Sequence, residues 1–179
     1  MSISRKRLLI VAAALVGAGV VAGAVYASGG GVTGGVPDRG TRPDSSVAVT
    51  DCKVTKADFI TNATTGLSTA SASYVPVPGM TKVVKVGGTT ASCVLAEVSG
   101  DSIALSGEQE DVGLTLDGNL GDPGGVVFSM NDPNAAQEHA ALFAFPSVAP
   151  GSHTVAMVFK SAFGGTVSMS FPAMRIDHR

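Results

Sequence analysis

The chain has 179 residues, of which 45% are hydrophobic, and 12 Lys and Arg against 14 Asp and Glu give a formal net charge of −2. Basic residues are few and nowhere dense enough to form a patch, so nucleic acid is excluded as a favoured partner. The length suits one domain with a tail and is sufficient to bury a hydrophobic core.

Residues 1–27 have the layout of an export signal. A basic start, Arg5 to Arg7, precedes an uncharged run from Leu8 to Tyr26, and Ala27 offers a small residue at a cleavage site before Ser28. The run is also about as long as a helix that crosses a bilayer, so a cleaved signal and an uncleaved membrane anchor both stay open. Since the basic residues come first, both interpretations place the rest of the chain outside the cytoplasm.

Residues 28–46 are rich in Gly and Pro and poor in apolar side chains, which predicts a flexible linker. Residues 47–179 have the composition of one globular domain. The whole chain is therefore expected to consist of a signal peptide or anchor helix, a linker and a single extracytoplasmic domain.

Cys52 and Cys93 are the two cysteines, and both lie in the exported part. In an oxidising compartment an even pair predicts a disulfide, and no Cys or His stands at zinc-site spacing. A bond closing a loop of roughly 40 residues would stabilise the fold by about 4 kcal/mol. The alternative is two buried free thiols.

Short runs of alternating apolar residues, separated by Gly, Pro, Asn and Asp, predict many strands. Residues 57–63 favour a helical turn instead, and residues 135–145 favour a helical turn that continues into a strand. Pro78-Gly79 predicts a turn between two strands, Pro76 an edge strand, and residues 107–111 a solvated acidic turn. The predicted strands cover residues 47–54, 71–77, 81–86, 92–99, 101–105, 112–116 and 126–130. In the strand at 92–99, pairing of Cys93 with Cys52 would turn Leu95 toward the core.

Residues 150–176 predict a β-hairpin with one apolar face. This face is expected to form one side of the hydrophobic core of the domain. Two alternating runs carry that face and are separated by Gly164-Gly165. Val158 is the one apolar residue out of phase. The core face of the hairpin is expected to comprise Val155, Met157, Phe159, Val167, Met169 and Phe171.

Together these strands predict an all-β fold, an antiparallel β-sandwich and most economically a jelly roll. The segments 116–118, 150–155 and 164–167, reading Leu-Asp-Gly, Pro-Gly-Ser-His-Thr-Val and Gly-Gly-Thr-Val, resemble the closing strands of jelly-roll modules. Such modules occur in small exported actinobacterial proteins, phage tail tips and, more remotely, C1q/TNF-type proteins. The resemblance covers roughly residues 71–176 and implies a binding or assembly module, sometimes trimeric, without catalysis. It transfers no binding residue, because these modules use variable loops.

Residue constellations for catalysis are absent from the sequence. His139, His153 and His178 occur in no zinc-binding motif, and His153 is expected to bond a neighbouring loop at the rim while His178 frays with the C-terminus. Ser152 stands beside His153, but adjacent strand residues point to opposite faces, so this pair cannot form a nucleophile and base. We therefore expect no catalytic, cofactor-binding or metal-binding residue and no enzymatic activity.

Two binding chemistries remain as alternatives. Sugar sites usually offer flat aromatic platforms, and the exported part has Tyr74 as its one Tyr and no Trp, which weighs against a carbohydrate-binding module or glycan-active enzyme. Residues 117–122 space oxygen donors like a degenerate calcium loop, although a loop of turn-forming residues needs no ion.

The sequence thus predicts an exported, non-catalytic binding or surface-assembly module. Its partner would be a protein or surface ligand, or a second copy of the chain, with membrane contact only through an uncleaved N-terminus. The loops at residues 108–111 and 117–125 are the first place where a ligand is expected.

Overall fold

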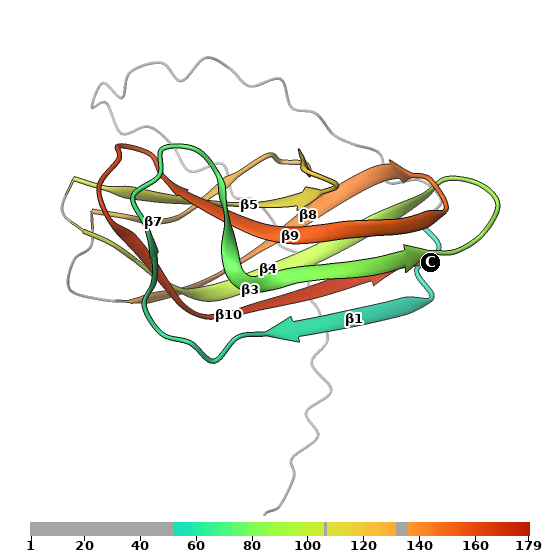
Figure 1. The fold of residues 1–179 in the computed structure, drawn as a ribbon, viewed down its shortest axis with the longest axis horizontal. Helices are drawn as coiled ribbons and strands as arrows, with labels where there is room; N and C mark the ends of the chain where they lie inside the picture. Colours follow the sequence, from blue (N-terminus) through green and yellow to red (C-terminus); the bar gives the residue numbers. More distant parts are fainter. Residues whose placement is uncertain (1–51, 106, 132–135) are drawn as a thin grey trace, which may run out of the picture. The chain divides into compact units, whose positions relative to one another are not determined.

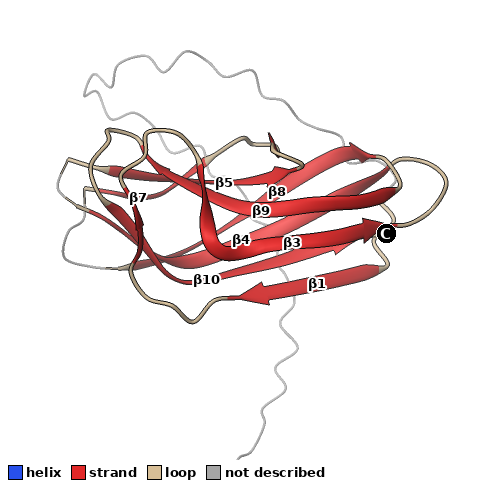
Figure 2. Ribbon diagram, in the orientation of Figure 1, coloured by secondary structure: helices blue, strands red, loops and turns tan. Residues whose placement is uncertain are grey.

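The computed structural model describes residues 52–105, 107–131 and 136–179, and these form two antiparallel sheets without any helix (Figures 1 and 2). The expected all-β class is therefore confirmed. The predicted signal or anchor, the linker and residues 47–51 lie outside the described residues. Within the described ranges no helix is long and apolar enough to cross a membrane.

Each sheet has five strands. In each sheet two of the strands pair, one after the other, with the same side of one neighbouring strand. In sheet A the order is β1-β10-β4-β8, with β2 also on β10, and in sheet B it is β3-β9-β5-β6, with β7 also on β5. Sheet A contains β1 (Lys56–Thr61), β2 (Leu67–Thr69), β4 (Ser92–Ala104), β8 (Gln137–Val148) and β10 (Val167–His178). Sheet B contains β3 (Val75–Val86), β5 (Gln109–Leu116), β6 (Asn119–Leu120), β7 (Val126–Met130) and β9 (Gly151–Ser161).

The core lies between the two sheets and is built from the alternate residues of every long strand. Aromatic, Met and branched side chains dominate it because they fill a pleated interface well. The larger fully buried members are Val77, Met80, Val84, Leu114, Phe143, Met157, Phe159, Met169, Met174 and Ile176.

The predicted hairpin at residues 150–176 is wrong as a pairing but largely right as a core face. β9 pairs with β3 and β5, whereas β10 pairs with β1, β2 and β4, so the two strands lie in different sheets. Their apolar sides still meet, because both face the same core. Phe171 is the exception: an irregularity between Ser170 and Ala173 interrupts the alternation, and the Phe171 side chain is 53% exposed.

Both predicted helical turns are also wrong, although the strand predicted at the end of residues 135–145 is confirmed. Residues 56–61 form β1, which pairs along its whole length with the C-terminal half of β10. Residues 137–148 form β8, which pairs with β4 from Ser92 to Ser102. In both segments tertiary pairing overrides a weak local preference for helix.

The strand boundaries around the prolines and the acidic run differ as well. Residues 75–86 form one strand, and Pro78-Gly79 lies in an irregularity of its pairing with β9 instead of a turn. The edge position that Pro76 predicts is confirmed, since β3 is the outermost strand of sheet B. The predicted solvated turn at residues 107–111 is wrong from Gln109 on, because β5 begins there and Glu110 is fully buried.

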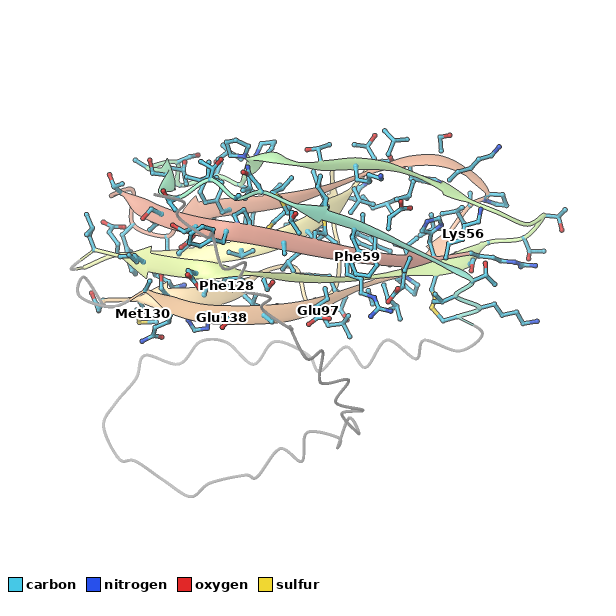
Figure 3. All side chains as sticks on the ribbon, turned by 90° about the horizontal axis from the view of Figure 1, so that it is seen from below. Lys56, Phe59, Glu97, Phe128, Met130 and Glu138 are labelled. Atoms are coloured by element: carbon cyan, nitrogen blue, oxygen red, sulfur yellow. A yellow bond between two sulfur atoms is a disulfide. The ribbon has the colours of Figure 1, made fainter. Side chains whose placement is uncertain are left out.

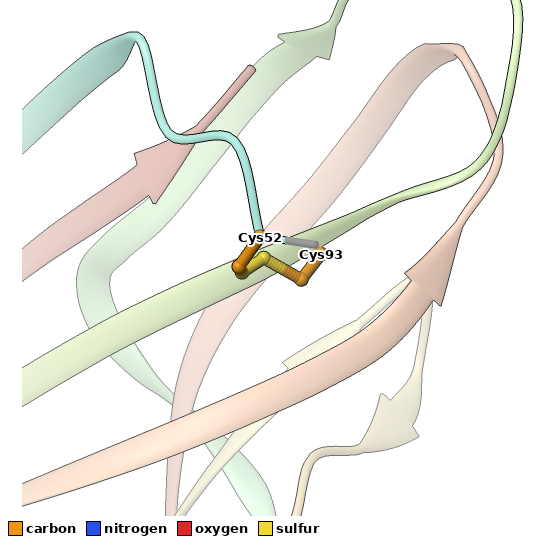
Figure 4. Close-up of a disulfide and its surroundings, with 2 residues drawn as sticks. All are labelled: Cys52 and Cys93. Carbon is orange, nitrogen blue, oxygen red and sulfur yellow. A yellow bond between two sulfur atoms is a disulfide. The ribbon is translucent and has the colours of Figure 1, made fainter. Parts of the chain in front are cut away.

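Cys52 and Cys93 form the predicted disulfide, with Cα atoms 5.1 Å apart (Figure 4). The bond ties the segment before β1 to the start of β4, and residues 52–55 are not part of a strand. Leu95 does not face the core as expected: it is half-buried, while Val94, Ala96 and Val98 occupy the core side of β4. Such a bond is typical of an oxidising, extracytoplasmic compartment.

Candidate binding surface

The outward side of sheet B, called the covered face below, is shielded over β5 by the chain itself. The segment from β6 to β7 folds back over β5, and a Cβ on Gly113 would lie 2.9 Å from Leu120 and 3.0 Å from the Gly124 carbonyl oxygen. This cover explains Val158, the residue out of phase in β9, because its outward side chain is only 4% exposed. Nearby, Lys160 lies 3.4 Å from an Asp111 oxygen.

The outward side of sheet A, called the open face below, has no comparable cover among the described residues. One row of directly paired residues crosses the sheet from β1 through β10 and β4 to β8. In this row Phe59 pairs with Arg175, Arg175 with Glu97, and Glu97 with Leu142. Phe59 is 65% and Leu142 62% exposed. Phe59 and Glu97 are both labelled in Figure 3, which shows the side chains of the domain.

A shallow depression of about 240 Å³ lies along this row. Small side chains form its floor because the adjacent row consists of Thr61, Ala173 and Ser99. Phe59, Glu97 and Arg175 line its sides. An aromatic ring, a cation, a carboxylate and two hydroxyl groups therefore surround one hollow.

Arg175 is held in place from two directions. Its Nε donates to Asp177 Oδ1 at 3.0 Å, and its guanidinium carbon lies 5.6 Å from the centre of the Phe59 ring. A guanidinium has five N–H donors, so this arrangement orients the group and leaves donors for a ligand. Glu97, Ser99 and Thr61 have no hydrogen-bond partner among the described residues apart from the sheet backbone.

A second hollow, of about 310 Å³, lies at the end of the sandwich near the β5–β6 and β8–β9 turns. It is lined by Leu116, Asn119, Phe145, Pro146, Ser147, Val148, Ala149 and His153. Although it is the larger hollow, its charged neighbours are already paired with each other. The open face keeps more polar groups for a ligand, and for this reason we take it as the candidate site.

His153 bonds a neighbouring turn, as the sequence predicts. Its Nδ1 lies 2.6 Å from Asp117 Oδ2, and its Nε2 lies 2.8 Å from the Ala149 carbonyl oxygen. The Asp117 hydrogen bond is the main cause that raises the pKa of His153, while the Thr154 N–H and His153 lower the pKa of Asp117. With acceptors at both ring nitrogens, the imidazolium is favoured and has no lone pair to activate a serine.

The loop that resembles a calcium site is a tight hairpin turn. Asp117 and Gly118 have φ values of 51° and 83° and join β5 to β6, as the sequence predicts for this dipeptide. Both Asp117 oxygens accept hydrogen bonds, one from the Thr154 N–H at 2.8 Å and one from His153. Within the described residues, no group of three or more His, Cys, Asp and Glu could hold a metal ion.

His178 differs from the prediction. It does not fray: its side chain is 2% exposed and its Nε2 lies 2.9 Å from Asp58 Oδ2. The His178 hydrogen bond is the main cause that lowers the pKa of Asp58, which also lies 3.4 Å from the Lys82 ammonium of β3. These contacts tie the edges formed by β1 and β3 to each other.

Glu110 marks a polar cluster between the sheets. Ser102 Oγ of β4 donates to Glu110 Oε2 and lies 2.7 Å from Ser129 Oγ of β7. Glu110 Oε1 is buried without a hydrogen-bond partner among the described residues. Burial raises the pKa of Glu110 to about 7, partly offset by the Ser102 hydrogen bond.

The candidate site lies outside the loops in which the sequence analysis expects a ligand. Of the loop at residues 108–111, Glu110 is buried and Glu108 Oε2 accepts a hydrogen bond from Ser161 Oγ at 2.6 Å. Tyr74 is a poorer platform than Phe59, because it is half-buried whereas Phe59 is 65% exposed. Phe59 was missed because residues 57–63 favour a helical turn, and its place on the sheet follows from the pairing of β1 with β10.

No family model and no curated protein matches the chain. Among solved structures, dimeric latent PorU from Porphyromonas gingivalis has a TM-score of 0.45 at 13% identity, over 74% of this chain and 14% of that chain. The VP2 subviral particle of infectious bursal disease virus has a TM-score of 0.45 at 10% identity, over 69% and 32%. The sugar-binding C-terminal domain of EclA has a TM-score of 0.39 at 14% identity, over 67% and 79%. Similarities at this level carry no argument about function.

Proposed function

We propose that this chain is an exported, non-catalytic binding module that docks a ligand on the open face. The observation that carries the proposal is the paired row of Phe59, Arg175 and Glu97 beside a depression floored by small side chains. Phe59 is 65% and Leu142 62% exposed in one row with two charged residues, and exposed apolar side chains rimmed by polar groups are typical of binding surfaces.

Architecture and compartment form part of the proposal. In both sheets, strands from the first and last parts of the chain alternate, and β1 lies beside β10, which supports a jelly-roll topology. The Cys52–Cys93 bond supports an oxidising compartment. Residues 1–27 would direct export and afterwards be removed or retained as the anchor.

Co-sedimentation with isolated cell-envelope fragments tests this function. The wild-type chain should sediment with the fragments, and Phe59→Ala should weaken binding by about tenfold or more. Phe163→Ala is the matched control, because Phe163 is 69% exposed but lies in the loop between β9 and β10. Equal losses for both variants, or no loss for Phe59→Ala, would contradict docking on the open face.

A carbohydrate ligand is the second candidate, and the depression itself favours it. Sugar rings offer apolar C–H faces that pack on aromatic rings and hydroxyl groups that hydrogen-bond to charged and polar side chains. Phe59 provides the ring, and Arg175, Glu97, Ser99 and Thr61 provide the polar groups. Affinity electrophoresis in gels containing xylan, β-glucan or glycol chitin should retard the wild-type chain and not Phe59→Ala.

An enzymatic role is the outcome that would overturn the proposal. Purified wild-type chain should leave a panel of ester and glycoside substrates unchanged. Turnover that survives Phe59→Ala would place a catalytic site elsewhere in the domain, whereas turnover that this variant abolishes would make the depression an active site.

A further inference from the structure

Sheet A has one edge that lacks most of the usual protection against pairing with another strand. β8 pairs with β4 on one side, and on its other side Ala144 forms two backbone hydrogen bonds with Asp122, of 2.9 and 3.0 Å. Since hydrogen-bonding directions alternate along a strand, the backbone groups of Glu138, Ala140 and Leu142 point outward like those of Ala144. Within the described residues these three have no partner on that side.

The edges formed by β1 and β3 are protected in recognisable ways. β1 is six residues long, and its Asp58 is paired with Lys82 and His178. β3 contains Pro76 and Pro78, an irregular register and two lysines. Short length, prolines, bulges and charges are the features by which natural edge strands avoid association.

The open part of β8 has one of these features, the charge of Glu138, and lacks the others. Residues 137–143 contain no Pro, Lys or Arg, and the outward side chains include Ala140 and Leu142. Leu142 is 62% exposed, the same fraction as Val83 on the protected β3 edge. An apolar, extended edge of this kind is a template for a further strand.

We propose that this edge pairs with the same edge of a second copy of the chain, antiparallel and around a two-fold axis at Ala140. In this register Glu138 faces Leu142 of the second copy, so no like charges are opposed, and the smallest side chains lie at the axis. Glu138, Ala140 and Leu142 of one copy would pair with Leu142, Ala140 and Glu138 of the other. These three residue pairs would form about six backbone hydrogen bonds, two for each pair. The two copies of sheet A would join into one continuous sheet.

Pairing of two copies through the β8 edge does not depend on ligand binding at the open face. If both hold, the two open faces become contiguous, and a repeating surface ligand could be bound at two depressions at once, which increases apparent affinity. Dimer formation without any ligand would leave the present inference intact.

Cross-linking of the full-length chain tests the pairing. Because Cys52 and Cys93 are bonded to each other, Ala140→Cys introduces the one free thiol, and it lies at the proposed axis. A short bis-maleimide should convert Ala140→Cys into covalent dimers in isolated envelopes or mild detergent. Val83→Cys on the β3 edge is the control and should give at least about tenfold less dimer.

A charge exchange tests the register. Adding Leu142→Glu to Ala140→Cys places Glu opposite Glu138 and should reduce the dimer by about tenfold, and further addition of Glu138→Lys should restore it. Restoration shows that the loss did not come from misfolding. Equal cross-linking at Ala140 and Val83, failure of Glu138→Lys to restore the dimer, or cross-links to a different protein would overturn the proposal.

Discussion

The two outward faces of the sandwich are built from similar strands but differ in what lies over them. On the covered face, the segment between β6 and β7 packs against Gly113, and outward Val158 is as buried as a core residue. On the open face, Phe59 and Leu142 remain exposed in a row with Arg175 and Glu97. The difference separates residues that stabilise the fold from residues that are available to a ligand, and it can be tested residue by residue.

The largest expected effect concerns the Cys52–Cys93 bond, which ties the segment before β1 to the start of β4 in sheet A. Replacing both cysteines by serine opens a loop with a sequence separation of 41 residues and should lower the free energy of unfolding by about 4 kcal/mol on the chain-entropy model. Urea unfolding with and without a reductant measures it. Wild type should lose stability on reduction and the double variant should not; a wild type insensitive to the reductant would show that the bond is not formed.

The next largest effect is a pH dependence of stability caused by Glu110, which is buried between the two sheets. Because the pKa of Glu110 is raised from 4.5 to about 7, the folded chain keeps a proton that the unfolded chain has released between these values. The free energy of unfolding therefore falls as the pH rises through this window, by about 3 kcal/mol in total. Glu110→Gln should remove this part of the pH dependence.

Comparison of unfolding curves at pH 5 and pH 8 measures the Glu110 effect. Glu97→Gln on the open face is the control and should keep the wild-type pH dependence, since Glu97 is exposed. A Glu110→Gln variant with the same pH dependence as wild type would show that the carboxyl is solvated.

Gly113→Val should break the packing on the covered face. The added Cβ would lie 2.9 Å from Leu120 and 3.0 Å from the Gly124 carbonyl oxygen, closer than van der Waals contact, and such overpacking costs about 2 kcal/mol. Thermal unfolding measures the loss, while envelope binding should stay unchanged. Lys85→Ala, an exposed position of the same sheet, should change neither quantity. Full stability of Gly113→Val would show that the covering segment is loosely held.

The smallest effect on stability belongs to the open face. Phe59→Ala should change the free energy of unfolding by about 0.5 kcal/mol or less, because the ring is mostly exposed, yet it should abolish most binding. Parallel measurement of unfolding and envelope co-sedimentation checks both. A large loss of stability would assign Phe59 to the fold and remove it from the candidate site.

Sequence patterns predicted the layers of this fold better than its strand partners. Alternation in β9 and β10 correctly indicated which side of each strand is buried, with Phe171 as the exception. It could not indicate that the strands lie in different sheets, because two strands joined by a short loop can face the same core from opposite sides. Partner choice depends on contacts distant in sequence, such as those of β10 with β1.

The candidate site was harder to predict for a related reason. Phe59 stands among residues with a local preference for helix, and only its pairing with Arg175 shows that it lies on a sheet surface. Glu110 was assigned to solvent because its neighbours are acidic, although β-strand alternation turns it inward. In contrast, Asp117-Gly118 and the disulfide were predictable, since turn geometry and an even cysteine pair are local or compositional signals.

The central claim, that ligands dock on the open face, is tested most directly by hydroxyl-radical footprinting of the wild-type chain with and without cell-envelope fragments. Phe59 and Phe163 are 65% and 69% exposed, so both should be modified readily in the free chain. Binding is predicted to protect Phe59 and to leave Phe163 unchanged. Protection of Phe163 with undiminished modification of Phe59 would contradict the account.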